Sequence, residues 1–150
     1  MKRTRILVDA DACPVRAEIA RAARRFGVRV LFFSNASQEG SAANEEQIVR
    51  VSDRADAADF AIVSECAPSD IVVTDDIGLA AMVLGKGASA LSSRGRLFNP
   101  DEMEGLLHSR HVARKVRRAG GRTRGPRAMT KADRDSFGTG LTEWLRAMTA

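Results

Sequence analysis

Aromatic side chains are scarce in this chain of 150 residues, which has no tyrosine, one tryptophan and six phenylalanines. Few platforms are therefore available for base stacking. No apolar run approaches the roughly 20 residues that a membrane-spanning helix needs. Only three apolar residues separate the basic N-terminal residues from Asp9, too few for the apolar region of a signal peptide. These absences predict a cytoplasmic protein with no membrane segment.

The cysteine and glycine patterns argue against a zinc site, a disulfide and a glycine-rich phosphate loop. The two cysteines, Cys13 and Cys66, form no zinc motif with His108 or His111. Without a secretory signal a disulfide is not expected, so we interpret both thiols as small buried or half-buried side chains. The short stretch 85–87 lacks the spacing of a glycine-rich phosphate loop.

Acidic residues are absent between Gly105 and Arg127, although the whole chain has 19 of them against 24 basic residues. A basic tract beside an acidic pocket suits a phosphate ligand bound with a metal ion. A solvated helix followed by a flexible linker explains the same tract without any ligand. The candidate nucleic-acid contacts in the tract are Arg114, Lys115, Arg117 and Arg118.

Length and hydrophobic patterning predict one α/β domain. Short apolar runs at 5–9, 28–33, 47–51, 71–74 and 88–91 are predicted strands, and 14–26, 55–66 and 77–84 are predicted helices. The first two strands flank a helix in a unit of βαβ length, so we expect them to be parallel with a right-handed crossover. A polar loop is predicted over 34–44. The whole pattern favours a three-layer α/β/α fold with a mainly parallel sheet.

The character of the chain changes after the last predicted strand. We predict an α/β core over 1–98 and a basic helical C-terminal extension over 99–150, both within one domain. The extension should hold a helix from Asn99 to about Ala119, a linker over 120–126 and a last helix. Thr130 is the expected N-cap of that helix, with Asp133 in the capping-box position. Its apolar face is predicted to carry Phe137, Leu141, Trp144, Leu145 and Met148.

Carboxylates follow two of the predicted strands directly. Asp9 and Asp11 come after the first strand, and Asp75 and Asp76 come after the strand at 71–74. Sites of open α/β sheets lie outside the carboxyl ends of the strands, so these acids are expected to share one cleft. One of Asp75 and Asp76 should cap the next helix, and the other should point into the cleft.

A second acidic pair, Asp56 and Asp59, stands three residues apart on one face of a predicted helix. Without a functional role, Asp56 and Asp59 would simply form a solvated helix face, and Asp11 would cap a helix. Three further acids, Asp53, Glu65 and Asp70, are interpreted as ordinary surface residues.

Clustered carboxylates are typical of a divalent cation site, because hard cations prefer oxygen ligands. The hypothesis is therefore Mg²⁺ or Mn²⁺ bound by Asp9, Asp76 and Asp59, with Asp11 and Asp56 positioning water or a second ion. Such a site activates a water and stabilises a leaving oxygen in phosphodiester hydrolysis. Arg94, after the last core strand, is a candidate phosphate contact.

The string Val8-Asp9-Ala10-Asp11-Ala12-Cys13-Pro14 resembles the opening motif of the YaiI/YqxD family of uncharacterised bacterial proteins. The likeness continues through the Asn35 loop, 56–59, 74–80, 93–95, 125–126, 133–134 and Phe137, and covers nearly the whole chain. That family is grouped with PIN-like domains, many of which are metal-dependent ribonucleases. The resemblance implies a PIN-like fold. It also implies that Asp9, Asp11, Asp56, Asp59 and Asp76 lie in the acidic centre, with Asp76 favoured over Asp75, and makes Asn35 a candidate phosphate contact.

Three functions remain open at this point. The first is a metal-dependent nuclease that acts on RNA, with the basic tract binding the backbone. The second is a non-catalytic module that binds nucleic acid or a protein partner. The third is a hydrolase of small phosphoesters, which ranks last because no lysine is evident to stabilise an aspartyl intermediate. The oligomeric state is also open, a homodimer included.

Overall fold

The computed structural model describes residues 3–11, 13–35, 46–54, 56–122 and 127–150. Residues 36–44 of the predicted loop and 123–126 of the predicted linker lie outside the described residues. No helix within the described ranges is both long enough and apolar enough to span a membrane.

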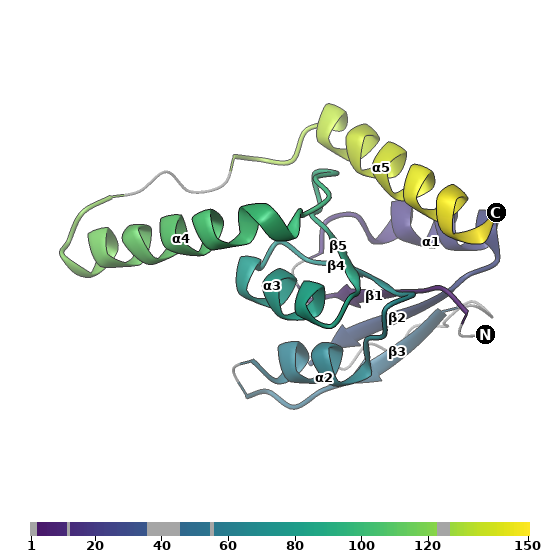
Figure 1. The fold of residues 1–150 in the computed structure, drawn as a ribbon, viewed down its shortest axis with the longest axis horizontal. Helices are drawn as coiled ribbons and strands as arrows, with labels where there is room; N and C mark the ends of the chain where they lie inside the picture. Colours follow the sequence, from purple (N-terminus) through teal and green to yellow (C-terminus); the bar gives the residue numbers. More distant parts are fainter. Residues whose placement is uncertain (1–2, 12, 36–45, 55, 123–126) are drawn as a thin grey trace.

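A five-stranded sheet forms the centre of the molecule (Figure 1). Its strands are β1 (Arg5–Asp9), β2 (Arg29–Ser34), β3 (Glu46–Arg50), β4 (Ile71–Val73) and β5 (Ser89–Leu91). They lie in the order β3-β2-β1-β4-β5, and all four pairings are parallel. The predicted three-layer α/β class with a parallel sheet is therefore confirmed.

Helices cover both faces of the sheet because its strands alternate their side chains between two apolar clusters. Ile6 and Val8 of β1 belong to the cluster that includes α1 (Arg16–Phe26) and α5 (Lys131–Thr149). Leu7 belongs to the opposite cluster, with α2 (Ala57–Glu65) and α3 (Ile77–Gly85). A short 3₁₀ turn, η1 (Pro100–Glu102), leads into α4 (Met103–Arg118).

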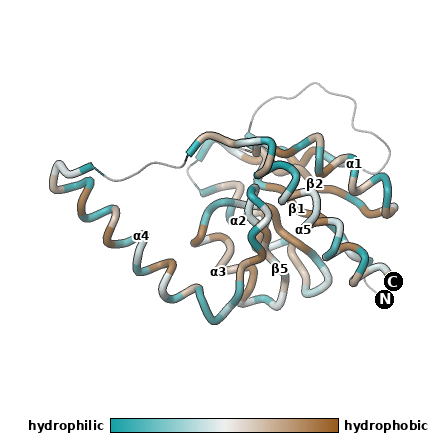
Figure 2. The backbone as a smooth tube through the Cα atoms, turned by 90° about the horizontal axis from the view of Figure 1, so that it is seen from above, coloured by the Kyte–Doolittle hydropathy of each residue, from teal (hydrophilic) through white to brown (hydrophobic). Residues whose placement is uncertain are grey.

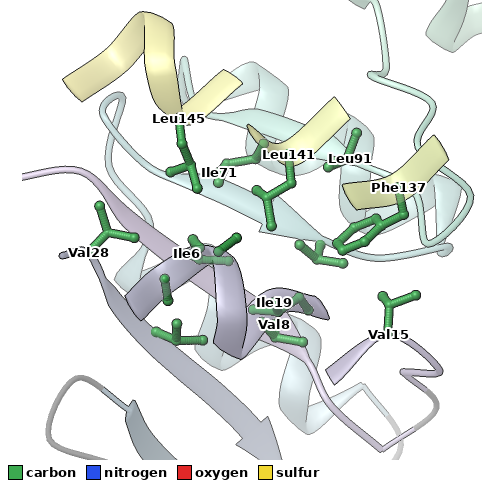
Figure 3. Packing of buried hydrophobic residues seen from close by; sticks show 14 of the residues in the cluster. Ile6, Val8, Val15, Ile19, Val28, Ile71, Leu91, Phe137, Leu141 and Leu145 are labelled. Carbon is green, nitrogen blue, oxygen red and sulfur yellow. The ribbon is translucent and has the colours of Figure 1, made fainter. Parts of the chain in front are cut away.

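The last helix completes one layer of the core. Phe137, Leu141 and Leu145 of α5 are fully buried and point at β1, β4 and β5 (Figure 3). The predicted capping box is present, because the Thr130 hydroxyl accepts from the Asp133 backbone N–H while the Asp133 carboxylate accepts from the Thr130 N–H. The apolar face of α5 is shorter than predicted, because Met148, near the end of the helix, is 43% exposed.

In contrast, α4 contacts the body near its start and then extends away from it (Figures 1 and 2). Met103 is buried beside α3, whereas Val112 and Val116 are exposed. The predicted helix from Asn99 is real, but its first turn is 3₁₀, with the Asn99 side chain accepting from the Asp101 N–H.

One surface acid was predicted wrongly. Asp70 is fully buried, where its carboxylate accepts from the Arg5 guanidinium at 2.8 and 3.2 Å and from the Ala67 N–H at 2.8 Å. Pairing with Asp70 raises the pKa of Arg5. Asp70 ends the turn before β4, and β4 lies next to β1, so the fold brings Arg5 onto it. Glu65, by contrast, is half-exposed, as expected for a surface acid.

Leu141→Ala should lower the free energy of unfolding by about 2–5 kcal/mol, because it leaves a cavity under α5. Met148→Ala, on the same predicted face of α5, should change it by less than about 0.5 kcal/mol. Urea denaturation followed by circular dichroism measures both. Equal losses in the two variants would mean that α5 is not docked as described.

Candidate acidic site

The ends of β1 and β4 meet at one edge of the sheet, as the parallel register Val8↔Val73 requires. A pocket of about 190 Å³ lies there. Its lining includes Asp9, Cys13, Thr74, Asp75, Asp76 and Ser93. The predicted meeting of acids from two strand ends is therefore present in the structure. Cys13, interpreted from the sequence as a buried or half-buried thiol, also lines this pocket and is partly buried.

Thr74 links the two strand ends. Its hydroxyl donates to Asp9 Oδ2 at 3.4 Å and accepts from the Asp76 backbone N–H at 3.0 Å. Burial raises the pKa of the Asp9 carboxyl, the negative charge of Asp76 raises it further, and the Thr74 hydrogen bond opposes both. Asp9 is thus held in a place where its charge is unfavourable unless a cation accompanies it.

The two acids after β4 have different partners. Asp75 accepts from the Ser93 N–H at 2.9 Å and the Ser93 hydroxyl at 2.6 Å, so it joins the end of β4 to the loop after β5. Asp76 caps α3 by accepting from the Gly78 and Leu79 N–H groups at 2.8 and 3.2 Å. Asp76 therefore caps the helix, and both acids line the first pocket, where Asp75 also binds the neighbouring loop.

A second pocket, of about 440 Å³, shares Asp76 with the first. Asp59 lines it from α2, Asp56 from the position just before α2, and Arg110 from α4. Asp56 precedes α2 with a φ of 66° and makes no side-chain cap hydrogen bond. Aspartate tolerates this left-handed backbone better than most residues. The structure thus gathers four of the five predicted catalytic acids, Asp9, Asp56, Asp59 and Asp76, along two adjoining pockets.

Asp59 is the most perturbed acid of this group. Its pKa is raised to about 6, first by partial burial and then by the charges of Asp76, Asp9 and Asp56. Arg110 acts in the opposite direction and lowers the pKa of Asp59.

Arg110 is the site residue that sequence analysis missed. Its Nη1 lies 3.3 Å from Asp76 Oδ1, and both side chains are about one-third exposed. The guanidinium can approach because residue 78 is glycine: a Cβ there would lie 2.5 Å from Arg110 Nη1. The only signal in the sequence is that Arg110 is the first cation of the acid-free tract and so the nearest to the core.

Asp11 lies at the same edge of the sheet but outside the two pockets. Its carboxylate accepts from the Ser34 hydroxyl at 2.5 Å and the Asn35 backbone N–H at 3.0 Å, so it binds the end of β2. Asn35 is exposed beside it. Neither residue lines the two pockets.

The predicted phosphate contacts fall into two groups. Arg94 donates to Asp133 at 2.5 Å and to the Arg127 carbonyl, and so links the loop after β5 to α5. Gly95, with a φ of 89°, permits this contact, because a Cβ there would lie 2.5 Å from the Ser136 carbonyl oxygen. The α4 candidates, Arg114, Lys115, Arg117 and Arg118, are all exposed beyond Arg110.

Carboxylates are the ligands that Mg²⁺ and Mn²⁺ favour, so the donor chemistry fits the predicted ion. Within the described part of the chain, however, no three His, Cys, Asp or Glu side chains are arranged to hold one metal ion together. A site here would resemble those in which one or two carboxylates bind Mg²⁺ and water fills the other positions.

Fold and site together define an α/β protein with carboxylates along the carboxyl edge of a parallel sheet. Residues 7–147 match the model of a family described as "Uncharacterized BCR, YaiI/YqxD family", and the chain belongs to this family. The fold is consistent with the PIN-like fold that the resemblance implies.

Curated relatives cover nearly the whole chain. A UPF0178 protein of Bacillus cytotoxicus is 39% identical over 142 residues, which is 95% of this chain and 93% of the relative. A UPF0178 protein of Lachnoclostridium phytofermentans is 38% identical over 149 residues, 97% and 99% of the two chains. One of Listeria monocytogenes is 39% identical over 141 residues, 94% and 95%. No solved structure matches the chain.

Asp59 should titrate near pH 6 in a carboxyl-carbon NMR titration of the cation-free protein. Arg110→Ala should raise this pKa and Asp76→Asn should lower it, because each removes one of the charges that act on Asp59.

A native-state pKa above the unfolded value means that native Asp59 holds its proton over a pH range where unfolded Asp59 has lost it. The stability contributed by this proton is full below pH 3.8 and is lost as the pH rises through about 6. Asp59→Asn should therefore stabilise the fold at pH 7 but not at pH 3.5. Titration of Asp59 near pH 4 would contradict this electrostatic account.

Proposed function

We propose that this protein is a divalent-cation-dependent phosphodiesterase that cleaves RNA, with its reactive centre at the acidic edge formed by β1, β4 and α2. The observation that carries the proposal is the shared position of Asp76. It lies in one pocket with Asp9 and in the adjoining pocket with Asp59, three residues from three different parts of the chain.

The electrostatics of the acidic edge support the binding of a cation there. Burial raises the pKa of both Asp9 and Asp59, and neighbouring negative charges raise both further, so the cluster is under repulsion in the cation-free protein. Arg110 offsets part of that repulsion, through its ion pair with Asp76 and through its effect on the pKa of Asp59. A structural role alone gives no reason to concentrate uncompensated acids at a partly buried strand end.

Asp9 and Asp76 would hold the ion, and Asp59 would bind a second ion or orient water. A bound Mg²⁺ or Mn²⁺ supplies a water of lowered pKa and positive charge against the leaving oxygen. Thr74 fixes the Asp9 carboxylate through its hydroxyl, and the α3 N-terminus fixes Asp76 Oδ1. The chain thereby holds these two carboxylates in place before substrate arrives.

The basic face of α4 would bind the RNA backbone. Arg110 joins this helix to the acidic edge, and Arg114, Lys115, Arg117 and Arg118 continue along the part that extends from the body. Contacts between such cations and phosphates give salt-sensitive affinity that tolerates many sequences.

A non-catalytic RNA-binding module is the second candidate, and the ion pair between Arg110 and Asp76 favours it. An arginine already beside Asp76 offsets the charge that a metal ion would use. This candidate requires RNA binding that persists in EDTA without any cleavage in Mn²⁺.

Asp9→Asn should reduce Mn²⁺-dependent cleavage of a fluorescent RNA by about 100-fold or more, because a ligand to a catalytic metal contributes several kcal/mol. Its circular dichroism spectrum and unfolding midpoint should remain close to those of the parent, because the substitution removes an unfavourable charge. Asp101→Asn, at an exposed acid outside both pockets, is the matched control. Full cleavage by the Asp9 variant would refute the proposed chemistry.

Arg110→Ala should raise Mn²⁺ affinity about fivefold, since a partly exposed ion pair competing for Asp76 is worth up to about 1 kcal/mol. Gly78→Ala should act in the same direction without changing any charge, because the added Cβ displaces the guanidinium. Isothermal titration calorimetry measures both.

Arg114→Ala is the control for this pair, because it removes an equal charge one turn further along α4. Its Mn²⁺ affinity should stay close to that of the parent protein. Weaker Mn²⁺ binding by the Arg110 variant would mean that this arginine helps the ion rather than competing with it.

A further inference from the structure

A groove of about 770 Å³ runs between α1 and α5, on the face of the sheet opposite α2 and α3. Five cationic side chains line it. They are Arg21 and Arg25 of α1, and Lys131, Arg134 and Arg146 of α5. Three acids, Glu18, Asp135 and Glu143, also line the groove, so its net charge is positive. The proposed phosphodiesterase uses none of these residues.

Glu18 of α1 pairs with one cation from each wall of the groove. Arg134 lies 3.5 Å from Glu18 Oε1, and Arg21 lies 3.7 Å from the same oxygen. The other three cations, Arg25, Lys131 and Arg146, form no ion pair with any residue that the structure describes. Their positive charge is therefore available to a ligand at both ends of the groove.

The lining indicates which kind of ligand fits. The uncharged residues that line the groove are Ala22, Gly138 and two threonines, and none of them is aromatic or a large aliphatic residue. Protein partners usually bind through such anchors, so an acidic protein is disfavoured. The same lack of aromatics leaves no platform for stacked bases. Guanidinium groups pair in bidentate fashion with phosphate oxygens, which makes a phosphate backbone the best match.

One end of the groove adjoins the acidic pocket. Arg134 donates to the Pro14 carbonyl at 2.6 Å, and Pro14 lines the pocket that contains Asp9. From Lys131 to Arg146 the groove follows α5 for about 22 Å, at the usual rise per helical residue. A strand lying in it would therefore lead directly to the acidic edge.

We propose that the groove between α1 and α5 binds the phosphate backbone of RNA and leads it to the acidic edge. The inference rests on the proposed function for its substrate class. Binding in the groove nevertheless needs neither the metal ion nor cleavage, so it can be tested alone.

The test measures the affinity of the full-length protein for a fluorescent 16-nucleotide RNA of mixed sequence by anisotropy in EDTA, over a series of salt concentrations. Arg25→Ala/Arg146→Ala removes two exposed cations from the far end of the groove. Affinity should fall, and the slope of log affinity against log salt should become shallower by about 1.4, or about 0.7 for each lost contact. Glu143→Gln, which removes an acid from the same groove, should tighten binding.

Arg3→Ala/Arg29→Ala is the matched control, because these exposed arginines line a different pocket, with residues around the end of α2. It removes the same charge and should leave the salt slope unchanged. Equal losses in the two double variants, or no loss in the groove variant, would overturn the proposal. The proposal would also be overturned if poly-glutamate competed with the RNA and bound the protein more tightly than the RNA does.

Cleavage provides the separate readout. If the groove variant loses RNA affinity while the parent protein shows no Mn²⁺-dependent cleavage, the groove stands and the proposed hydrolysis fails. If cleavage is present but the groove variant binds RNA as the parent does, the hydrolysis stands and the groove assignment fails.

Discussion

The parallel pairing of β1 with β4 is the constraint on which the acidic edge depends. These strands are separated by more than 60 residues, yet their register aligns Val8 with Val73 and so ends both strands at the same level. Asp9 and Thr74 follow at adjacent positions, which is why one hydroxyl can link Asp9 to the backbone of Asp76. A shift of one residue in this register would turn the side chains of one strand to the other face and separate the acids.

The fold keeps these acids close together through three kinds of contact. The α3 N-terminus binds Asp76, the loop after β5 binds Asp75, and Arg110 reaches Asp76 from α4. These contacts compensate the acids that follow β4, but Asp9 and Asp59 keep a raised pKa. Burial is the largest cause at both residues, and the remaining repulsion is centred on Asp76, whose charge acts on both of them. A cation at that place would relieve it, which links the stability of the edge to the proposed activity.

The sequence was sufficient for features that depend on neighbours along the chain. The five strands follow from apolar runs, and the capping box of α5 follows from the spacing of Thr130 and Asp133. Parallel topology then places Asp9 and Asp76 at one edge, which made the candidate site predictable in outline. Contacts across long separations were not predictable. Asp70 meets Arg5 across 65 positions and Arg110 meets Asp76 across 34, and neither pair has a local pattern. The role of Gly78 depends entirely on the second of these contacts.

The two faces of α5 explain how one helix serves both the core and a cationic surface. Helical periodicity sends Phe137, Leu141 and Leu145 into the sheet. The same periodicity brings Arg134, Gly138 and Thr142, spaced four residues apart, onto the side that borders α1. Because the buried face fixes the rotation of the helix, the position of its cations relative to α1 is fixed as well. Arg94 and Gly95 set the start of α5 through contacts with Asp133 and the Ser136 backbone. Arg94 therefore affects the basic groove indirectly. It holds the helix that forms one wall, and its own charge is paired with Asp133.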